Sequence, residues 1–398
     1  MNIIRLKTLT FLCIIVFSFN GLIFPQTYLV SMKKLDEVKT FVNSESKLYK
    51  SQYERLIRSA DKMVKDKMLS VVDKGRIPDS GDKHDYMSMA PYWWPNPETE
   101  DSLPYVRKDG ERNPGRLEIS DHSYFSRATN SIFELSLAYY LSGNKKYAEK
   151  AVQYLNYWFL DSKTKMNPNL NYAQAVKGMN NGRGSGVLEG RGLIFIVDAL
   201  GVLKHAGGID DNTYLGLKKW LTQYLKWMLE SKNGKSEYKA ANNHGSWYDA
   251  QVVSYALFVG DTVTALKHAQ RVKERIENQI TIDGKQPAEL VRTNSYGYSF
   301  FNLEALAMLS RLSENLNING WNYSTQDGKS MIKALEYMYP YALNETPWPH
   351  QQISERGKDG PARVFLYAYF ATGEKKYYQA ALSVKNNDLH DMIELLYL

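Results

Sequence analysis

The stretch ANNHGSWYDA, residues 241–250, places two amides directly before a histidine. An imidazole can take a proton while a neighbouring amide holds an anionic oxygen by hydrogen bonding. We therefore interpret Asn243 and His244 as candidates for proton abstraction beside a negatively charged oxygen. The alternative is a structural histidine in the core. The aromatic residues that follow, Trp247 and Tyr248, are expected to begin a packed helix.

Other chemistries for His244 have little support in the sequence. No second histidine or carboxylate lies four residues away, and the seven histidines are scattered, so we expect no metal site. The sequence contains no G-x-S-x-G motif, which a serine nucleophile of the hydrolase type would require. The single cysteine, Cys13, lies in the N-terminal apolar segment, so we expect no thiol nucleophile in the mature chain.

A second candidate segment, AELVRTNSYGYSFFNLEAL, spans residues 288–306. Arg292 precedes Tyr298 by six residues and could hold a fixed cation near that phenol. Tyrosine has an ordinary pKa of about 10, and a nearby guanidinium favours the phenolate, so we expect the pKa of Tyr298 to fall. Tyr296 is the competing phenol, and a core position for both tyrosines is the alternative.

Two long irregular segments could form a binding groove. Residues 80–114 combine five prolines with aromatic and charged residues, whereas residues 166–192 combine amides and arginines with glycines. Aromatic faces stack on sugars, and amides with arginines suit a hydroxylated, carboxylated polymer. The alternatives are a packed loop and a glycine-rich turn. The candidate substrate-binding residues are Tyr86, Trp94, Asn171, Gln174, Arg183 and His350.

Helical hairpins must position these residues. Apolar residues recur at helical spacing on both sides of glycine-centred turns, and strand signals are scarce. Repeated helical pairs stack on one another, so we predict an all-α, single-domain (α/α) toroid of about five to seven hairpins. Residues 76–116 and 166–192 would gather at one mouth of the ring. The glycines at the clearest turns are Gly143, Gly207, Gly208, Gly260 and Gly373.

The first 26 residues are expected to be a signal peptide, leaving residues 27–398 as one catalytic domain. Arg5 and Lys7 precede the apolar run TLTFLCIIVFSFNGLIF, a pattern typical of export to the periplasm or outside the cell. A membrane anchor is the alternative. Cleavage would remove two positive charges and lower the formal net charge from +7 to about +5. This excess favours an anionic ligand.

Taken together, these segments resemble the alginate-lyase group of polysaccharide lyases, family 38 more than family 5. The likeness extends over about residues 75–375. The spacing between arginine and tyrosine is one residue shorter than family 5 would give, so the choice of Tyr298 over Tyr296 depends on the YSFFNL match. The motifs that carry the resemblance are Asn243-His244, ELVR, YSFFNL, DYMSMAPYWWP, LPYVRKDGERNP and NPNLNYAQAV.

The resemblance implies β-elimination of a polyuronate without metal or other cofactor. Asn243 and Arg292 would neutralise the uronate carboxylate, with His244 assisting, while a base removes the C5 proton and an acid protonates O4. In mannuronate these groups are syn, and Tyr298 could serve both steps. In guluronate they are anti, and His244 would be the base and Tyr298 the acid.

The resulting prediction is a lyase that cleaves alginate, especially polymannuronate, and leaves 4,5-unsaturated ends. A β-1,4-glucuronan lyase would use the same catalytic set, because glucuronate also presents H5 and O4 syn. A non-catalytic glycan-binding protein is a further alternative. A glycoside hydrolase would need two carboxylates facing each other across the groove, for which the candidates are Asp82, Asp85, Asp121 and Glu189.

Overall fold

The computed structural model describes residues 27–44 and 49–384. The predicted signal peptide, residues 1–26 with Cys13, lies outside the described residues. Fourteen α-helices and four short strands form in the described part of the chain. The helices are α1 (Met32–Val42), α2 (Lys50–Lys65), α3 (Asp121–Ser142), α4 (Lys145–Leu155), α5 (Leu193–His205), α6 (Asp211–Glu230), α7 (Lys232–Tyr238), α8 (Asn243–Val259), α9 (Thr262–Gln279), α10 (Pro287–Leu290), α11 (Ser295–Ser313), α12 (Met331–Ala342), α13 (Asp359–Thr372) and α14 (Lys375–Ser383).

Glycine turns join the predicted helical pairs. Gly143 follows α3 with a φ of 71°, and Gly260 follows α8 with a φ of 89°. Gly207 and Gly373 make the corresponding turns after α5 and α13, with φ values of 69° and 73°. Glycine takes this left-handed conformation without steric cost, which lets the chain reverse directly after a helix. The pair α11 and α12 is joined instead by a longer segment.

The helices differ in how much of their surface is buried. Of the 17 residues of α8, 14 are buried, whereas only 7 of the 18 residues of its partner α9 are buried. A helix that is buried on all sides lies in the interior, while an amphipathic helix has one face in solvent. The first helix of the hairpin is therefore internal and the second is external.

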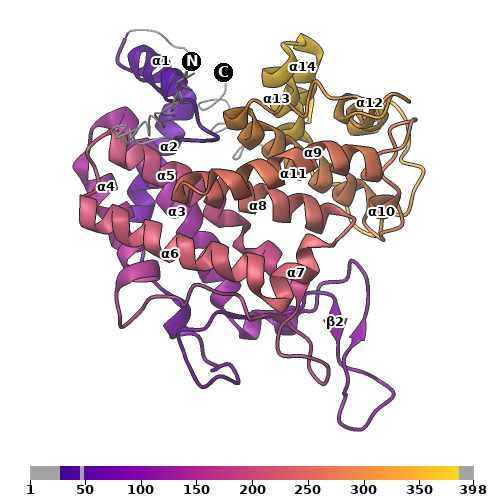
Figure 1. The fold of residues 1–398 in the computed structure, drawn as a ribbon, viewed down its shortest axis with the longest axis horizontal. Coiled ribbons are helices and arrows are strands. Elements are labelled where there is room, and N and C mark those ends of the chain that lie inside the picture. The colour runs from indigo at the N-terminus through magenta and orange to yellow at the C-terminus, as the bar shows by residue number, and fades with distance from the viewer. Residues whose placement is uncertain (1–26, 45–48, 385–398) are drawn as a thin grey trace, which may run out of the picture.

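The internal helices pack against one another in chain order. α3 contacts α5, α5 contacts α8, α8 contacts α11, and α11 contacts α13. Three internal helices also contact the next external helix strongly, in the pairs α3–α4, α8–α9 and α13–α14. Figure 1 shows the helices arranged in this way. The fold is the predicted (α/α) toroid. No helix in the described ranges is long and apolar enough to cross a membrane.

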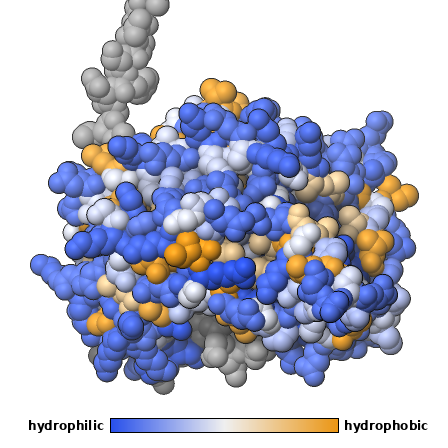
Figure 2. All heavy atoms as spheres, turned by 90° about the horizontal axis from the view of Figure 1, so that it is seen from below, coloured by the Kyte–Doolittle hydropathy of each residue, from blue (hydrophilic) through white to orange (hydrophobic). Residues whose placement is uncertain are grey.

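The two irregular insertions meet on one side of the helices. Strand β1 (Met87–Met89) from the first pairs in parallel with β4 (Tyr172–Ala175) from the second. Within the first insertion, β2 (Trp93–Trp94) pairs antiparallel with β3 (Val106–Arg107). In Figure 1 these loops lie below α6, α7 and α8. Figure 2 views the molecule from that side, where the surface is mainly hydrophilic with scattered apolar groups.

Candidate active site

The start of α8 places Asn243 and His244 in a structured turn. The side chain of Asn242 caps the helix by accepting a hydrogen bond from the backbone N–H of His244 at 3.2 Å. Asparagine is favoured at this position because its side chain satisfies a helical N–H that lacks a backbone partner. Most of the rest of α8 is buried, Trp247 and Tyr248 included, as predicted. The helix therefore anchors both candidate residues firmly.

Asn243 is fully buried and bound to a carboxylate on α10. Its backbone N–H and its Nδ2 each donate to one oxygen of Glu289, both at 2.7 Å. Burial raises the pKa of Glu289, although the two hydrogen bonds from Asn243 oppose this shift. The side-chain oxygen of Asn243 has no hydrogen-bond partner within the described residues. One N–H of Nδ2 and the amide oxygen thus lack a hydrogen-bond partner among the described residues, and Asn243 is one of the residues that line the adjoining cavity.

His244 is held by a carboxylate on the preceding helix. Its Nδ1 lies 2.5 Å from Oε1 of Glu237, which belongs to α7. The side chain of Glu237 is 4% exposed, whereas that of His244 is 20% exposed. The imidazole therefore has one edge against a buried carboxylate and the other toward solvent.

Arg292 and Tyr298 form a stacked pair at the start of α11. The guanidinium carbon of Arg292 lies 3.7 Å from the centre of the Tyr298 ring. Asp109, from the first insertion, accepts from Nε of Arg292 at 3.1 Å and from Nη2 at 2.7 Å. The hydroxyl oxygens of Tyr298 and Tyr92 are 2.7 Å apart. The predicted fixed cation near the phenol is present.

The prediction that the pKa of Tyr298 falls is wrong. Burial of the phenol, the largest effect, and the neighbouring Tyr92 raise its pKa well above the ordinary value, while Arg292 lowers it by less. The sequence shows the arginine but not the desolvation, which disfavours the charged phenolate. The phenol of Tyr298 is therefore protonated at neutral pH.

The competing phenol, Tyr296, lies in the core. Its ring packs edge-on against Phe300 and Trp348, with ring centres 5.1 Å and 5.5 Å away. Burial raises the pKa of Tyr296 to about 12, with a smaller opposing effect from Arg356. Tyr296 has a packing role, whereas Tyr298 faces the cavity.

A cavity of about 1160 Å³ joins these groups. Its walls include Tyr92, Asn243, His244, Arg292 and Tyr298. Among the described residues that line it, six are arginines and three are glutamates, so its field favours an anionic ligand. No group of three or more metal-ligating side chains occurs in the described residues. The lining charges are Arg107, Arg112, Arg116, Arg183, Arg191, Arg292, Glu189, Glu237 and Glu355.

The family model described as alginate lyase matches residues 70–348, more than half of the chain. The chain belongs to the alginate lyase family. The prediction of a polysaccharide lyase is confirmed by this match and by a solved alginate lyase from Bacteroides ovatus. That structure is 39% identical in sequence, has a TM-score of 0.88, and is matched over 94% of this lyase and 99% of its own chain.

More distant structures share the fold of this lyase. Alginate lyase A1-III from Sphingomonas species A1 is 14% identical with a TM-score of 0.56, over 94% of this chain and 98% of that one. A variant of A1-III complexed with a tetrasaccharide is 15% identical with a TM-score of 0.61, over 94% and 96% of the two chains. No curated protein matches the chain.

Two of the predicted substrate-binding residues line the cavity of the lyase. Nη2 of Arg183 donates to the side-chain oxygen of Gln174 at 2.9 Å. Gln174 has a φ of 53°, a left-handed conformation that is uncommon for a residue with a side chain. Backbone strain of this kind is concentrated at functional sites. Both residues are therefore placed to contact a ligand.

The other four predicted binding residues lie outside this cavity. Tyr86 is fully buried, and its hydroxyl donates to Glu189 at 2.7 Å. Tyr86 therefore holds a residue that lines the cavity but does not line the cavity itself. Nε1 of Trp94 donates to the carbonyl of Glu111 at 3.0 Å. Asn171 accepts from Trp227 at 2.7 Å, and Nε2 of His350 lies 2.8 Å from the hydroxyl of Tyr337. The burial of Tyr86 corrects its assignment as a binding residue, because the sequence does not distinguish residues of a wall from residues behind it. The assignments of Trp94, Asn171 and His350 stay predictions.

The carboxylates considered for a glycoside hydrolase do not face one another across the cavity. Asp121 is buried beside Lys74, with 3.1 Å between the charged atoms. Asp82 and Asp85 both accept from Nδ2 of Asn167. Of the four candidates only Glu189 lines the cavity. The opposed pair that hydrolysis requires is therefore absent from these candidates.

Sequence reasoning missed the residues that hold the predicted ones. Tyr92, Asp109, Glu237 and Glu289 each contact one catalytic candidate directly. In the sequence, Tyr92 is only one of several aromatic residues in the first insertion. For Asp109, Glu237 and Glu289, no sequence motif links the carboxylate to the residue that it contacts. Asp109, for example, lies 183 residues from Arg292 in the chain. Such contacts are set by the fold.

Proposed function

We propose that this protein is an alginate lyase that cleaves polymannuronate most readily by metal-independent β-elimination. The observation that carries the proposal is the stacking of Arg292 on Tyr298 beside Asn243 and His244, in a cavity lined mainly by positive charge. These groups supply the three functions that β-elimination needs: carboxylate neutralisation, a base and an acid.

Neutralisation comes first, because the C5 proton of a uronate is very weakly acidic. The free N–H of Asn243 Nδ2 and the N–H groups of Arg292 Nη1 are the donors available for the substrate carboxylate. Hydrogen bonds to this group strengthen as negative charge develops on it during proton removal. Since the protein supplies this charge compensation, we propose that no metal is needed.

Proton transfer depends on the sugar. The protonated phenol of Tyr298 is suited to giving its proton to O4, the leaving oxygen. On mannuronate the phenol of Tyr298 would first release its own proton to solvent, and the guanidinium of Arg292 would stabilise the phenolate that results. This phenolate would remove the C5 proton from the same side and then give that proton to O4. On guluronate His244 would remove the proton from the opposite face. In both cases a C4=C5 double bond forms as the C4–O4 bond breaks.

The test is incubation of the purified protein with polymannuronate, polyguluronate, mixed alginate and β-1,4-glucuronan, without added metal and with a chelator. The unsaturated product absorbs ultraviolet light, because its double bond is conjugated to the carboxylate. We expect the fastest rise on polymannuronate. A faster rise on glucuronan would reassign the substrate, and binding without any rise would support a glycan-binding protein.

We also propose that the protein acts in the periplasm or outside the cell. The basic start and apolar run of the first 26 residues support this location. N-terminal sequencing of the mature protein, after expression with its full leader, would detect cleavage. An intact N-terminus in the membrane fraction would favour an anchor.

A further inference from the structure

The structure gives His244 a partner whose chemistry limits what the ring can do. We propose that Glu237 is a positioning residue that fixes His244 as the Nδ1–H tautomer, with the unprotonated Nε2 facing the cavity. The inference deepens the proposed function and rests on it only for the consequence in catalysis. The central observation is the 2.5 Å contact between Nδ1 of His244 and Oε1 of Glu237.

The tautomer follows from the hydrogen-bonding capacity of the two groups. An ionised carboxylate only accepts hydrogen bonds, so the ring nitrogen facing it must donate. In a neutral imidazole the other nitrogen then carries the lone pair. For His244 this second nitrogen is Nε2, on the edge of the ring away from Glu237, and the residue lines the cavity. Only an unprotonated nitrogen at this place could take the C5 proton.

Burial of the Glu237 carboxylate favours its hydrogen bond with His244 over hydrogen bonds with water. Glu237 is 3% exposed overall, so water competes poorly for its carboxylate. A buried carboxylate without a donor would be costly, which favours keeping the ring of His244 in place. Glu237 also lines the cavity beside His244, so rotation of the ring would leave a bare negative charge facing an anionic substrate.

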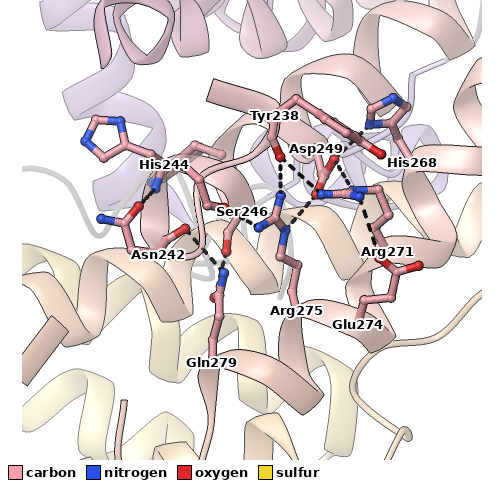
Figure 3. A network of polar contacts seen from close by, with 12 residues as sticks. Tyr238, Asn242, His244, Ser246, Asp249, His268, Arg271, Glu274, Arg275 and Gln279 are labelled. Carbon is pink, nitrogen blue, oxygen red and sulfur yellow. Dashed lines mark hydrogen bonds and ion pairs between the residues drawn. The ribbon is translucent and has the colours of Figure 1, made fainter. Parts of the chain in front are cut away.

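The chain segment that joins Glu237 to His244, here called the link, is held in place by two arginines. Arg275 donates to the carbonyls of Ala240 at 2.5 Å and of Tyr238 at 3.3 Å, and Arg271 donates to the same Tyr238 carbonyl at 3.3 Å. Both arginines also bind the fully buried carboxylate of Asp249. Figure 3 shows this cluster on one side of the link, while the imidazole of His244 points away from it. The cluster therefore fixes the relative positions of α7 and α8.

The tautomer alone does not show that the contact acts in catalysis, because a purely structural hydrogen bond to the carboxylate would select the same tautomer. A hydrogen bond that only stabilised the junction of α7 and α8 would change the melting temperature of a variant without affecting proton transfer. The comparison of kcat with KM separates the two roles, and a spectroscopic measurement on the ring tests the tautomer itself.

The first experiment measures the tautomer of His244 by nitrogen-15 NMR of the histidine side chains without substrate, at alkaline pH. His244→Gln identifies the signals. We expect Nδ1 to be protonated and Nε2 unprotonated in the wild-type protein. A wild-type ring protonated at Nε2 would overturn the proposal, whether or not the protein cleaves any polymer.

The second experiment compares Glu237→Gln with the wild type on the polyuronate that the wild type cleaves fastest and on polyguluronate. We expect kcat on polyguluronate to fall by about 10- to 100-fold, a loss typical of removing a hydrogen-bond partner behind a functional histidine. KM should change by less than about 3-fold, and the NMR spectrum should show a larger fraction of the Nε2–H tautomer.

The matched control is Glu274→Gln. Glu274 pairs with Arg271 at 3.6 Å but is 62% exposed and does not contact His244. This variant should keep the wild-type kcat and tautomer. An unchanged kcat in folded Glu237→Gln would overturn the catalytic role. If that variant does not fold, the wild-type NMR measurement decides. A wild type that cleaves none of the polymers contradicts the proposed function but leaves the tautomer assignment open to this direct measurement.

Discussion

The guanidinium of Arg292 lies over the phenol ring of Tyr298, with 3.7 Å between its central carbon and the ring centre. Asp109, from the first insertion, holds the guanidinium, and Tyr92 contacts the phenol hydroxyl. The phenol thus has a fixed place at the cavity, a cation that favours its ionised form and a buried setting that opposes ionisation. The following predictions test what each of these relations contributes.

Replacing Tyr298 by phenylalanine should abolish cleavage of every polyuronate. The change removes one hydroxyl, which we assign as the acid on all substrates, and general acid–base catalysis contributes about 10²- to 10⁴-fold. The measurement is the rate of double-bond formation at saturating substrate. Tyr296→Phe is the matched control, since Tyr296 packs in the core two residues earlier, and it should retain activity. Equal losses in the two variants would contradict the assignment.

Tyr298 should remain protonated above the ordinary tyrosine pKa of 10.0, because burial and Tyr92 raise its pKa more than Arg292 lowers it. The tyrosinate absorbance of the wild type minus that of Tyr298→Phe should therefore show no ionisation step at or below this pH. A step well below pH 10 would mean that Arg292 dominates and that the phenolate is the resting form.

Asp109→Asn should lower kcat/KM by about 10-fold, since an amide cannot accept two charge-assisted hydrogen bonds from Arg292. The pKa of Asp109 is held well below its usual range despite an opposing effect of burial, because Arg292 and the backbone N–H of Thr293 bind the ionised form. The control is Glu98→Gln, an exposed change in the same insertion. Wild-type kinetics in both variants would show that Arg292 keeps its position without Asp109.

His244→Ala should reduce cleavage of polyguluronate more than cleavage of polymannuronate. On guluronate the base and acid act from opposite faces, so the imidazole has no substitute, whereas on mannuronate Tyr298 serves both steps. Initial rates on the two polymers give the comparison directly. Equal losses would indicate that His244 mainly positions or neutralises the substrate.

Gly245→Ala should destabilise the protein by several kcal/mol and impair activity with it. A Cβ at this position would lie 2.1 Å from the carbonyl oxygen of Ala240 and 2.3 Å from Nη1 of Arg275. Relief of this overlap would displace the link between Glu237 and His244. Thermal unfolding measures the effect, and Gly75→Ala, where a Cβ has no neighbour within 4 Å, is the control.

The sequence predicts the frame of the lyase better than the surroundings of its site. Helical spacing and turn glycines such as Gly143 are local signals, and the structure confirms the hairpins that they indicate. The side chains of Asn243, His244, Arg292 and Tyr298 do meet at one cavity. By contrast, the burial of Tyr86 and the raised pKa of Tyr298 depend on residues far away in the chain. Local sequence patterns do not indicate such desolvation, because it is caused by residues that are distant in the chain.

The ion pair between Asp109 and Arg292 spans 183 positions of the chain. One of its members belongs to an irregular loop and the other to the start of an internal helix. Exchanging the loop with that of a relative would therefore also exchange the counter-ion of Arg292. Chimeras of this fold, whether arising by recombination or made in the laboratory, must transfer a suitably placed carboxylate along with the loop if the arginine is to stay over its tyrosine.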